Sequence, residues 1–290
     1  DVNGCVNSAT NTIEVYALPV VTWTNLLTTQ CETSTTYTLT GGNPAGGVYS
    51  GPGVTGTNFN ASVAGVGVHT LTYTYTDLNS CVNSATQNIT VDLCIVNVDL
   101  KLFLQGYYLP GTGQTMQPVL NNQLVPGSLA TETDTIVVEL HHPTTYAFID
   151  SKLAVLSTVG LASATFTQHP GSYFIAIKHR NTLQTWSKTP IACSFSTPLY
   201  DFSIAANKAY GDSQIGVEAN VWAFYTGNLN GDDYIDGNDF PLYDAQSGSG
   251  GLFDGTYTAA DMNGDGYVDG NDFPVFDANS YTGTTAQYPQ

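Results

Sequence analysis

The chain has 290 residues, and its 24 acidic side chains outnumber six Lys and Arg, which gives a formal net charge of −18. This balance argues against binding to nucleic acid or anionic membrane surfaces, because both are bound through Lys and Arg. No apolar run approaches the length of a membrane span, and no signal peptide opens the sequence, so a secreted form would have lost its signal or carry it upstream. The length suffices for two or three domains.

The first ten residues reappear later in the chain. Residues 1–10 read DVNGCVNSAT and residues 77–86 read DLNSCVNSAT. The second copy lies between two strand-like segments, HTLTYTYT (69–76) and QNITV (87–91), while the first leads into TIEVYAL (12–18). The spacing is about that of one small immunoglobulin-like sandwich. We therefore expect residues 1–17 to be the terminal strand of an incomplete repeat and residues 18–93 to form a complete one.

Strand 8–17 of this incomplete repeat would expose unpaired backbone and an apolar stripe that includes Ile13 and Val15. Three explanations are open. The chain is a fragment of a longer polypeptide with upstream repeats, or the segment is disordered. Alternatively, it completes a sandwich in a neighbouring copy by strand addition, which builds a filament if repeated head to tail.

The cysteines are widely spaced, and none lies in a C-x-x-C pair, which argues against zinc or thioredoxin-like chemistry. In a Thr- and Gly-rich β-protein this spacing predicts structural disulfides and an extracellular location. We expect Cys31 to bridge with Cys81 inside the complete repeat, and Cys94 with Cys193 around the next domain. Cys5 is left over and should pair with a cysteine one repeat upstream.

The "GCVNSAT" turn and the Tyr/Thr-rich strand before it resemble the tandem PKD-like and immunoglobulin-like repeats of very large Bacteroidetes surface proteins. The resemblance covers residues 1–92. It implies an extracellular β-sandwich and says little about what the repeat binds. The partners expected from the incomplete repeat are other copies of the chain or upstream repeats of the same polypeptide.

A second sandwich is expected over residues 94–222. Strand patterns occupy residues 96–106, 134–142, 146–157, 160–167 and 172–181. In the first of them, Val96, Val98, Leu100 and Leu102 fall on one face, and such period-two alternation predicts a sheet with one buried face. The segment ATFTQHPGSYFIAIKHRNTLQTWS resembles transthyretin-like or Cna-B-like sandwiches of bacterial surface proteins.

No catalytic constellation stands out in this region. His141 and His142 are adjacent, so on a strand their side chains point to opposite faces. Neither G-x-S-x-G nor H-E-x-x-H occurs. We therefore predict that the chain is not an enzyme, and that Lys178 and Arg180 are solvated strand residues, with a carbohydrate contact as the alternative.

Two twelve-residue segments carry the strongest functional signal. Residues 228–239 read NLNGDDYIDGND and residues 261–272 read DMNGDGYVDGND, within a C-terminal stretch (223–290) that holds eleven Asp and no Glu, Lys or Arg. Both match the loop that wraps calcium with oxygens at positions 1, 3, 5, 7, 9 and 12. The predicted ligands for two calcium ions are Asn228, Asn230, Asp232, the Tyr234 carbonyl, Asp236 and Asp239 in the first loop, and Asp261, Asn263, Asp265, the Tyr267 carbonyl, Asp269 and Asp272 in the second. The alternative interpretation is two similar Asn/Asp/Gly turns.

The loops differ at position 6, where a sharp turn favours positive φ. Gly266 meets that requirement in the second loop, whereas the first loop has Asp233, which we expect to tolerate the same conformation at some cost. The apolar residues at position 8, Ile235 and Val268, should pair the loop backbone with a partner or enter the core.

Both loops continue into D-F-P, and Pro241 and Pro274 can sit only in the first turn of a helix, so the following helices must be short. This loop–helix duplication resembles dockerin domains. The resemblance implies calcium binding, but dockerins contact cohesins through residues at loop positions 10 and 11, commonly a hydroxyl pair. This chain has Gly237-Asn238 and Gly270-Asn271 at those positions. We therefore expect the calcium ligands of dockerins in this chain, but not their cohesin partner.

The sequence thus predicts a mainly β fold of tandem immunoglobulin-like sandwiches followed by a small dockerin-like α module with two EF-hand-type calcium loops. The expected function is that of a non-catalytic extracellular structural protein, such as a stalk, adhesin or filament subunit, made rigid by calcium. A glycan or another surface ligand is a further candidate partner. The alternative is a non-catalytic binding or anchoring module of a secreted glycan-degrading enzyme.

Overall fold

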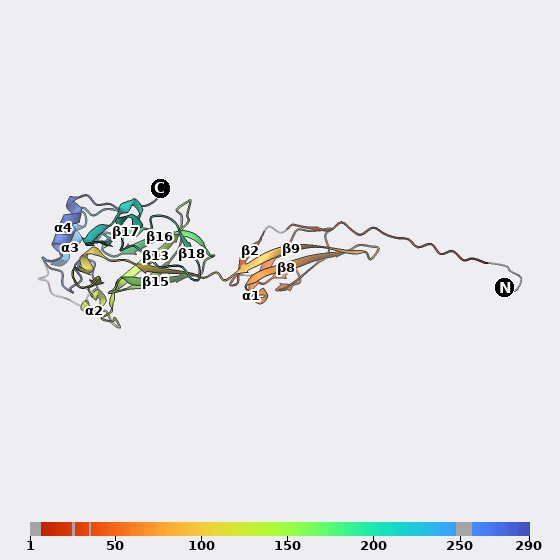
Figure 1. The fold of residues 1–290 in the computed structure, drawn as a ribbon, viewed down its shortest axis with the longest axis horizontal. Coiled ribbons are helices and arrows are strands. Elements are labelled where there is room, and N and C mark those ends of the chain that lie inside the picture. Colours follow the sequence, from red (N-terminus) through yellow and green to blue (C-terminus); the bar gives the residue numbers. More distant parts are fainter. Residues whose placement is uncertain (1–6, 25–26, 35, 248–256) are drawn as a thin grey trace. The chain divides into compact units, whose positions relative to one another are not determined.

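The computed structural model describes residues 7–24, 27–34, 36–247 and 257–290, which include most of every predicted domain. The chain divides into two compact units, residues 1–94 and residues 95–290 (Figure 1). Strands predominate in both, so the predicted mainly β fold is confirmed at that level.

The first unit is organised around a long antiparallel hairpin, β8 (Gly67–Thr76) and β9 (Val82–Asp92), which are the longest strands of this unit. The four-stranded sheet has the order β2-β9-β8-β5, with β2 (Thr29–Cys31) parallel to β9 and β5 (Val48–Ser50) antiparallel to β8. The remaining elements are β1 (Thr22–Trp23) paired with β4 (Gly42–Asn43), the three-stranded sheet of β3 (Tyr37–Thr38), β7 (Asn58–Phe59) and β6 (Val54–Thr55), and the short helix α1 (Ala61–Ala64). One buried cluster joins them: Trp23, Leu39, Phe59, Ala61, Leu71, Tyr73, Ile89 and Val91.

The repeated D-x-N-x-C motif forms the turn of this hairpin in its second copy. Asp77 Oδ1 accepts hydrogen bonds from the backbone N–H groups of Asn79 (2.8 Å) and Cys81 (2.9 Å). Ser80 has a φ of +62°, a left-handed conformation that tight turns require. An Asp that caps its own turn in this way is a common turn-forming device, so the motif encodes the reversal of the chain.

The predicted disulfide pairings are wrong. The bond joins Cys31 to Cys94, whose Cα atoms are 5.2 Å apart, while Cys81 and Cys193 are free thiols. The reason lies in strand order: β2 runs parallel to β9 and places Cys31 level with Asp92, next to Cys94. Cys81 lies at the opposite end of β9, about 30 Å away along an 11-residue strand. Cys5 lies outside the described residues.

Residues 7–18 form no strand ladder with the described part of the chain, in contrast to the predicted strand at 12–18. Ile13 and Val15 are exposed, at 85% and 87% of their surface. The carbonyl of Pro19 accepts a 2.8 Å hydrogen bond from the Asn83 side chain of β9.

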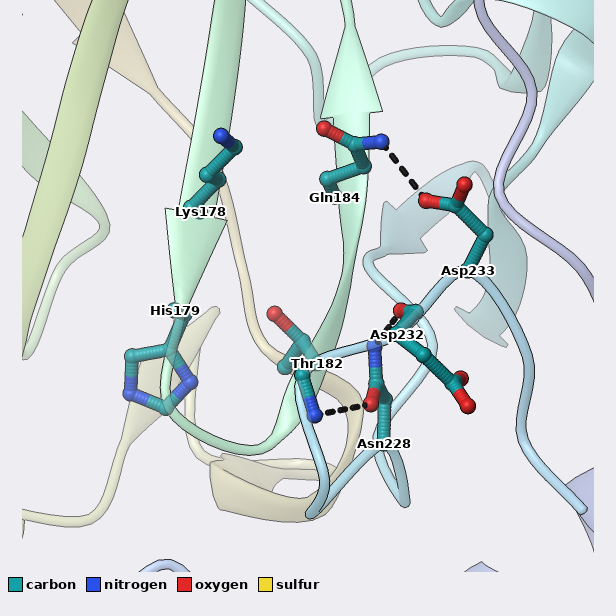
Figure 2. Close-up of a pocket in the computed structure, with 8 residues that line it drawn as sticks. Lys178, His179, Thr182, Gln184, Asn228, Asp232 and Asp233 are labelled. Carbon is teal, nitrogen blue, oxygen red and sulfur yellow. Dashed lines mark hydrogen bonds between the residues drawn. The ribbon is translucent and has the colours of Figure 1, made fainter.

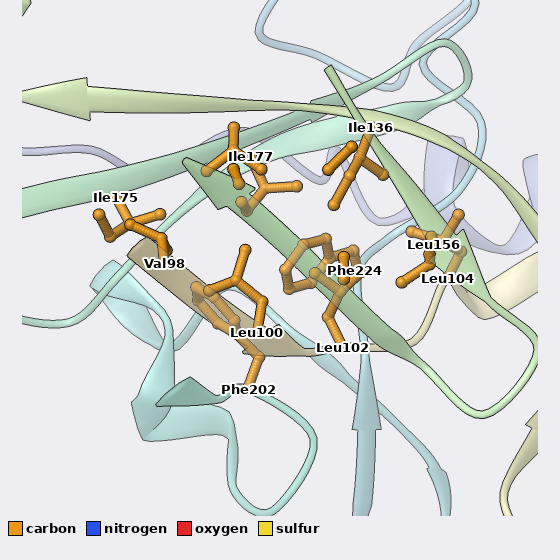
Figure 3. Close-up of a cluster of buried hydrophobic side chains, with 14 of the residues drawn as sticks. Val98, Leu100, Leu102, Leu104, Ile136, Leu156, Ile175, Ile177, Phe202 and Phe224 are labelled. Atoms are coloured by element: carbon orange, nitrogen blue, oxygen red, sulfur yellow. The ribbon is translucent and has the colours of Figure 1, made fainter. Parts of the chain in front are cut away.

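The second unit contains the predicted β-sandwich. One sheet has the order β15-β10-β19, from β15 (Leu161–Phe166), β10 (Val96–Lys101) and β19 (Tyr200–Asp201). The other has the order β14-β13-β16-β17, from β14 (Phe148–Ser157), β13 (Glu132–His141), β16 (Gly171–His179) and β17 (Thr182–Trp186), with β18 (Ile191–Cys193) also paired to β16. Alternation in β10 buries Val96, Val98 and Leu100, as predicted. Figure 3 shows Val98 and Leu100 in one cluster with Ile136, Ile175, Ile177, Phe202 and Phe224.

Short elements surround the sandwich. They are the hairpins β11 (Tyr108–Leu109) with β12 (Thr115–Met116) and β20 (Ile215–Glu218) with β21 (Val221–Ala223), the helix α2 (Val119–Asn122), and the 3-10 turns η1 (Gln105–Tyr107), η2 (Ala206–Lys208) and η3 (Tyr210–Asp212). None of the helices in the described ranges is long and apolar enough to cross a membrane.

Two short helices follow the predicted loops: α3 (Phe240–Ser247) and α4 (Phe273–Tyr281), each with its Pro as the second residue, as the sequence predicts. They pack in a cluster formed by Ile235, Tyr243, Met262, Phe276, Ala286 and Leu183. Leu183 belongs to β17. The C-terminal segment and the sandwich therefore share apolar packing within one unit.

Candidate metal centre

Position 12 organises both loops in the same way. In the first loop, Asp239 Oδ1 accepts hydrogen bonds from Leu229 N (2.7 Å) and Asn230 N (3.0 Å), and Oδ2 accepts one from Asp236 N (3.0 Å). In the second loop, Asp272 Oδ1 accepts from Met262 N (2.6 Å) and Asn263 N (2.9 Å), and Oδ2 from Asp269 N (2.9 Å). Each carboxylate thus draws positions 2, 3 and 9 of its loop around itself.

The earlier positions repeat a second pattern. The side-chain oxygen at position 3 accepts the N–H of position 5, and the oxygen at position 5 accepts the N–H of position 7. These bonds are 2.9 and 2.8 Å from Asn230 and Asp232, and 2.8 and 2.9 Å from Asn263 and Asp265. A carboxylate or amide oxygen keeps a second lone pair in such a turn, so these bonds leave acceptor capacity for a cation.

Three of the seven predicted ligand carboxylates are buried, which is unusual for acidic groups. Asp239 and Asp272 are fully buried, and Asp261 is 1% exposed. Burial raises the pKa of Asp272 to about 7 and also raises the pKa of Asp261. A buried charge is costly unless it is paired, and the sequence has no Lys or Arg from residue 223 onward. A divalent cation would supply the missing positive charge.

The carboxylates do not form a complete cage by themselves. In the described ranges, no three loop carboxylates bring their oxygens within 4.8 Å of one another. The predicted coordination therefore needs the amide oxygens at positions 1 and 3 and the carbonyl at position 7. Calcium accepts such mixed oxygen ligands in flexible geometry.

The two loops differ at position 6, and there one prediction is wrong. Gly266 has a φ of +96°, and its N–H donates a 2.9 Å hydrogen bond to Asp261 Oδ2. Asp233 does not adopt positive φ. At position 1 of the first loop, Asn228 is an amide rather than a carboxylate, and its Nδ2 donates to the Asp232 carbonyl. Position 1 is therefore bonded differently in the two loops: Asn228 donates to a backbone carbonyl, whereas Asp261 accepts the N–H of position 6.

Asp233 instead holds the first loop to its surroundings. Its carboxylate accepts hydrogen bonds from Gln184 Nε2 (2.8 Å) and from the Tyr288 hydroxyl (2.7 Å). Gln184 lies on β17 and, together with residues of the loop, lines a polar pocket of about 380 Å³ (Figure 2). The pocket is lined by Lys178, His179, Thr182, Gln184, Asn228, Gly231, Asp232 and Asp233. The predicted ligand Asp232 therefore stands beside side chains of the sandwich.

The residue at position 8 of the first loop, Ile235, meets both of its expected roles. Ile235 is fully buried, and its N–H donates a 3.0 Å hydrogen bond to the carbonyl of Thr284, while Tyr234 forms a β-bridge with Thr285. Val268 is partly buried against the same apolar cluster. The first loop is therefore paired with the segment that follows α4.

The second loop packs directly against helix α2. Asn122 Nδ2 donates a 2.7 Å hydrogen bond to the Gly264 carbonyl. A Cβ at Gly264 would lie 2.5 Å from a methyl of Val119, and one at Gly266 would lie 2.7 Å from the Asn122 carbonyl. Both glycines also have positive φ. These positions therefore serve the loop conformation and the close approach of α2 together.

Lys178, near the end of β16, and Arg180, just after it, pair with acidic side chains, and His141 and His179 lie beside the same carboxylates. Arg180 was expected to be solvated, but its side chain is only 15% exposed and lies 2.9 Å from Asp134 Oδ2, with its guanidinium 3.9 Å from the centre of the Tyr257 ring. His179 Nε2 lies 3.1 Å from the same oxygen. Lys178 pairs with Glu139 at 3.0 Å, and Glu139 also meets His141 at 3.1 Å.

Comparisons with known proteins add no assignment. No protein-family model matches the chain, and no curated protein matches it.

Proposed function

We propose that this chain is a non-catalytic extracellular structural protein that binds two calcium ions, one in each loop, and is made rigid by them. The observation that carries the proposal is the repeated hydrogen-bond scheme around Asp239 and Asp272, two fully buried carboxylates in a segment without Lys or Arg. Calcium would be held by the oxygens at positions 1, 3, 5, 7, 9 and 12. Its charge would offset the burial of the carboxylates.

The packing of the loops supports a mechanical role. Ile235 enters a cluster with Leu183 of β17, and Gly264 contacts α2, so ordering of either loop also orders the surface of the sandwich. A ligand that binds only the folded form stabilises it by mass action. This coupling suits a stalk, an adhesin or a filament subunit that must resist unfolding outside the cell.

Assembly by strand addition remains part of the proposal. Residues 7–18 are extended and exposed, and they make no backbone hydrogen bonds with other described residues. Ile13 and Val15 would provide alternate side chains for a neighbouring sheet edge, in another copy or in upstream repeats. The Cys31–Cys94 disulfide agrees with an oxidising location.

The experiment that tests the proposal compares limited proteolysis with and without a calcium chelator. Chelation should lower the melting temperature of the second unit and expose residues 223–290 to cleavage before the first unit is cut. Magnesium at the same concentration serves as the control ion, since it demands a smaller octahedral site. An identical digestion pattern in chelator and in calcium would refute the proposed role of calcium.

A further inference from the structure

We infer that Gln123 is a positioning residue for the second loop, because it holds the carboxylate of Asp261 in place. This calcium site is then built jointly by the loop and by the segment that follows helix α2. The inference rests on the proposed calcium function and goes beyond it. Gln123 lies 138 positions before Asp261 in the sequence, and it should control the calcium affinity of the second loop but not that of the first.

Gln123 follows directly after helix α2 and is 1% exposed. Its Nε2 donates a 2.6 Å hydrogen bond to Asp261 Oδ2, at position 1 of the loop. Its Oε1 accepts a 3.1 Å hydrogen bond from the backbone N–H of Thr258. Because a backbone N–H can only donate, this second bond fixes the amide orientation and leaves the NH₂ group facing the carboxylate.

Asp261 therefore receives donors from both sides. Gly264 N lies 2.7 Å from Oδ1, and Gly266 N lies 2.9 Å from Oδ2, which also accepts from Gln123. The Asp261 carbonyl faces Asn181 Nδ2 at 3.4 Å. Donors of this kind favour the ionised carboxylate and hold it in one orientation, as outer partners of metal ligands commonly do.

Among the described residues, no sandwich side chain hydrogen-bonds to position 1 of the first loop. Asn228 donates to the Asp232 carbonyl of its own loop and accepts from Gly231 N at 2.8 Å. The sandwich glutamine on that side, Gln184, bonds to Asp233, which occupies position 6 and is not a predicted ligand. Gln123 and Gln184 therefore form a matched pair, since each donates a hydrogen bond to an aspartate of a loop. Only Gln123 reaches a predicted calcium ligand.

The test uses the full chain, stripped of metal and titrated with calcium chloride in a calorimeter. Gln123→Met keeps most of the side-chain volume and removes the donor, so the affinity of one site should fall about 10- to 100-fold while the other stays constant. Gln184→Met loses a hydrogen bond of similar length to the first loop and should leave the affinity of the second loop unchanged. A purely structural role would lower the melting temperature in both variants without this difference in affinity.

Single-site backgrounds assign the effect to a loop. With the first loop disabled by Asp239→Ala, adding Gln123→Met should weaken the remaining site, and with Asp272→Ala it should not. Unchanged affinity in the Asp239→Ala background, or an equal loss from Gln184→Met, would overturn this inference alone. Absence of calcium binding by the unsubstituted chain would overturn the proposed function together with it. Gln123→Ala, which removes the same donor, provides a second variant if Gln123→Met does not fold.

Discussion

The hydroxyl of Tyr288 donates a 2.7 Å hydrogen bond to Asp233 Oδ2, which ties the segment after α4 to the first predicted calcium loop. The same segment donates Ala286 N to the Asp233 carbonyl at 2.8 Å. Tyr288→Phe should therefore lower the free energy of unfolding of the second unit by about 1 kcal/mol, the usual net value of one such bond. Urea denaturation measures the loss. Tyr281→Phe, at a residue 92% exposed, is the control, and equal effects of the two substitutions would contradict the role given to Tyr288.

The second loop should bind calcium more tightly than the first. It offers four carboxylates at ligand positions and keeps Gly266, whereas the first offers three and has neutral Asn228 at position 1. Ligand charge is one of the terms that set calcium affinity. Calorimetry should thus show that Asp272→Ala removes the tighter site and Asp239→Ala the weaker one. The reverse order would show that packing outweighs charge.

Sequence spacing identified the twelve-residue loops and the short helices after them, because both depend on neighbouring residues. Pro241 and Pro274 fix the start of α3 and α4, and alternation in β10 predicts its buried face. The contact between Gln123 and Asp261 depends on tertiary packing over more than a hundred positions, and no local pattern indicates it. The parallel pairing of β2 with β9 likewise decides the disulfide, and it cannot be read from cysteine spacing.

Cysteine chemistry tests the corrected pairing. In native, unreduced protein, iodoacetamide should label Cys81 and spare Cys193, whose burial raises the pKa of its thiol to about 11. Peptide mapping should recover Cys31 linked to Cys94. Replacing both by Ser opens a loop with a sequence separation of 63 and should cost the first unit about 4 kcal/mol by the chain-entropy estimate. A linked Cys31–Cys81 peptide would refute the pairing.

Acid should weaken the second unit through Asp134. Burial alone would raise the pKa of this carboxyl, but the adjacent His179 and Arg180 hold it well below its usual range. A lowered folded-state pKa gives stability that is present above the unfolded value of about 3.9 and is lost as the pH falls below it. Asp134→Asn should therefore flatten the fall of unfolding free energy between about pH 5 and pH 2.

The same variant should also be less stable at neutral pH, by on the order of 3–5 kcal/mol, because it leaves Arg180 largely buried without its partner. Asp150→Asn breaks the more exposed pair with Lys152, 3.5 Å apart, and should cost less than about 1 kcal/mol. Equal losses, or an unchanged acid response in Asp134→Asn, would contradict this interpretation of the buried pair.

If both loops bind calcium, the metal-stripped chain should take up two ions. Native mass spectrometry of the metal-stripped chain, titrated with calcium, counts the bound ions. We predict two ions per chain in the unsubstituted protein and one in either Asp239→Ala or Asp272→Ala. A chain that takes up no calcium, or that takes up the same number after both aspartates are replaced, would show that the loops are not calcium sites.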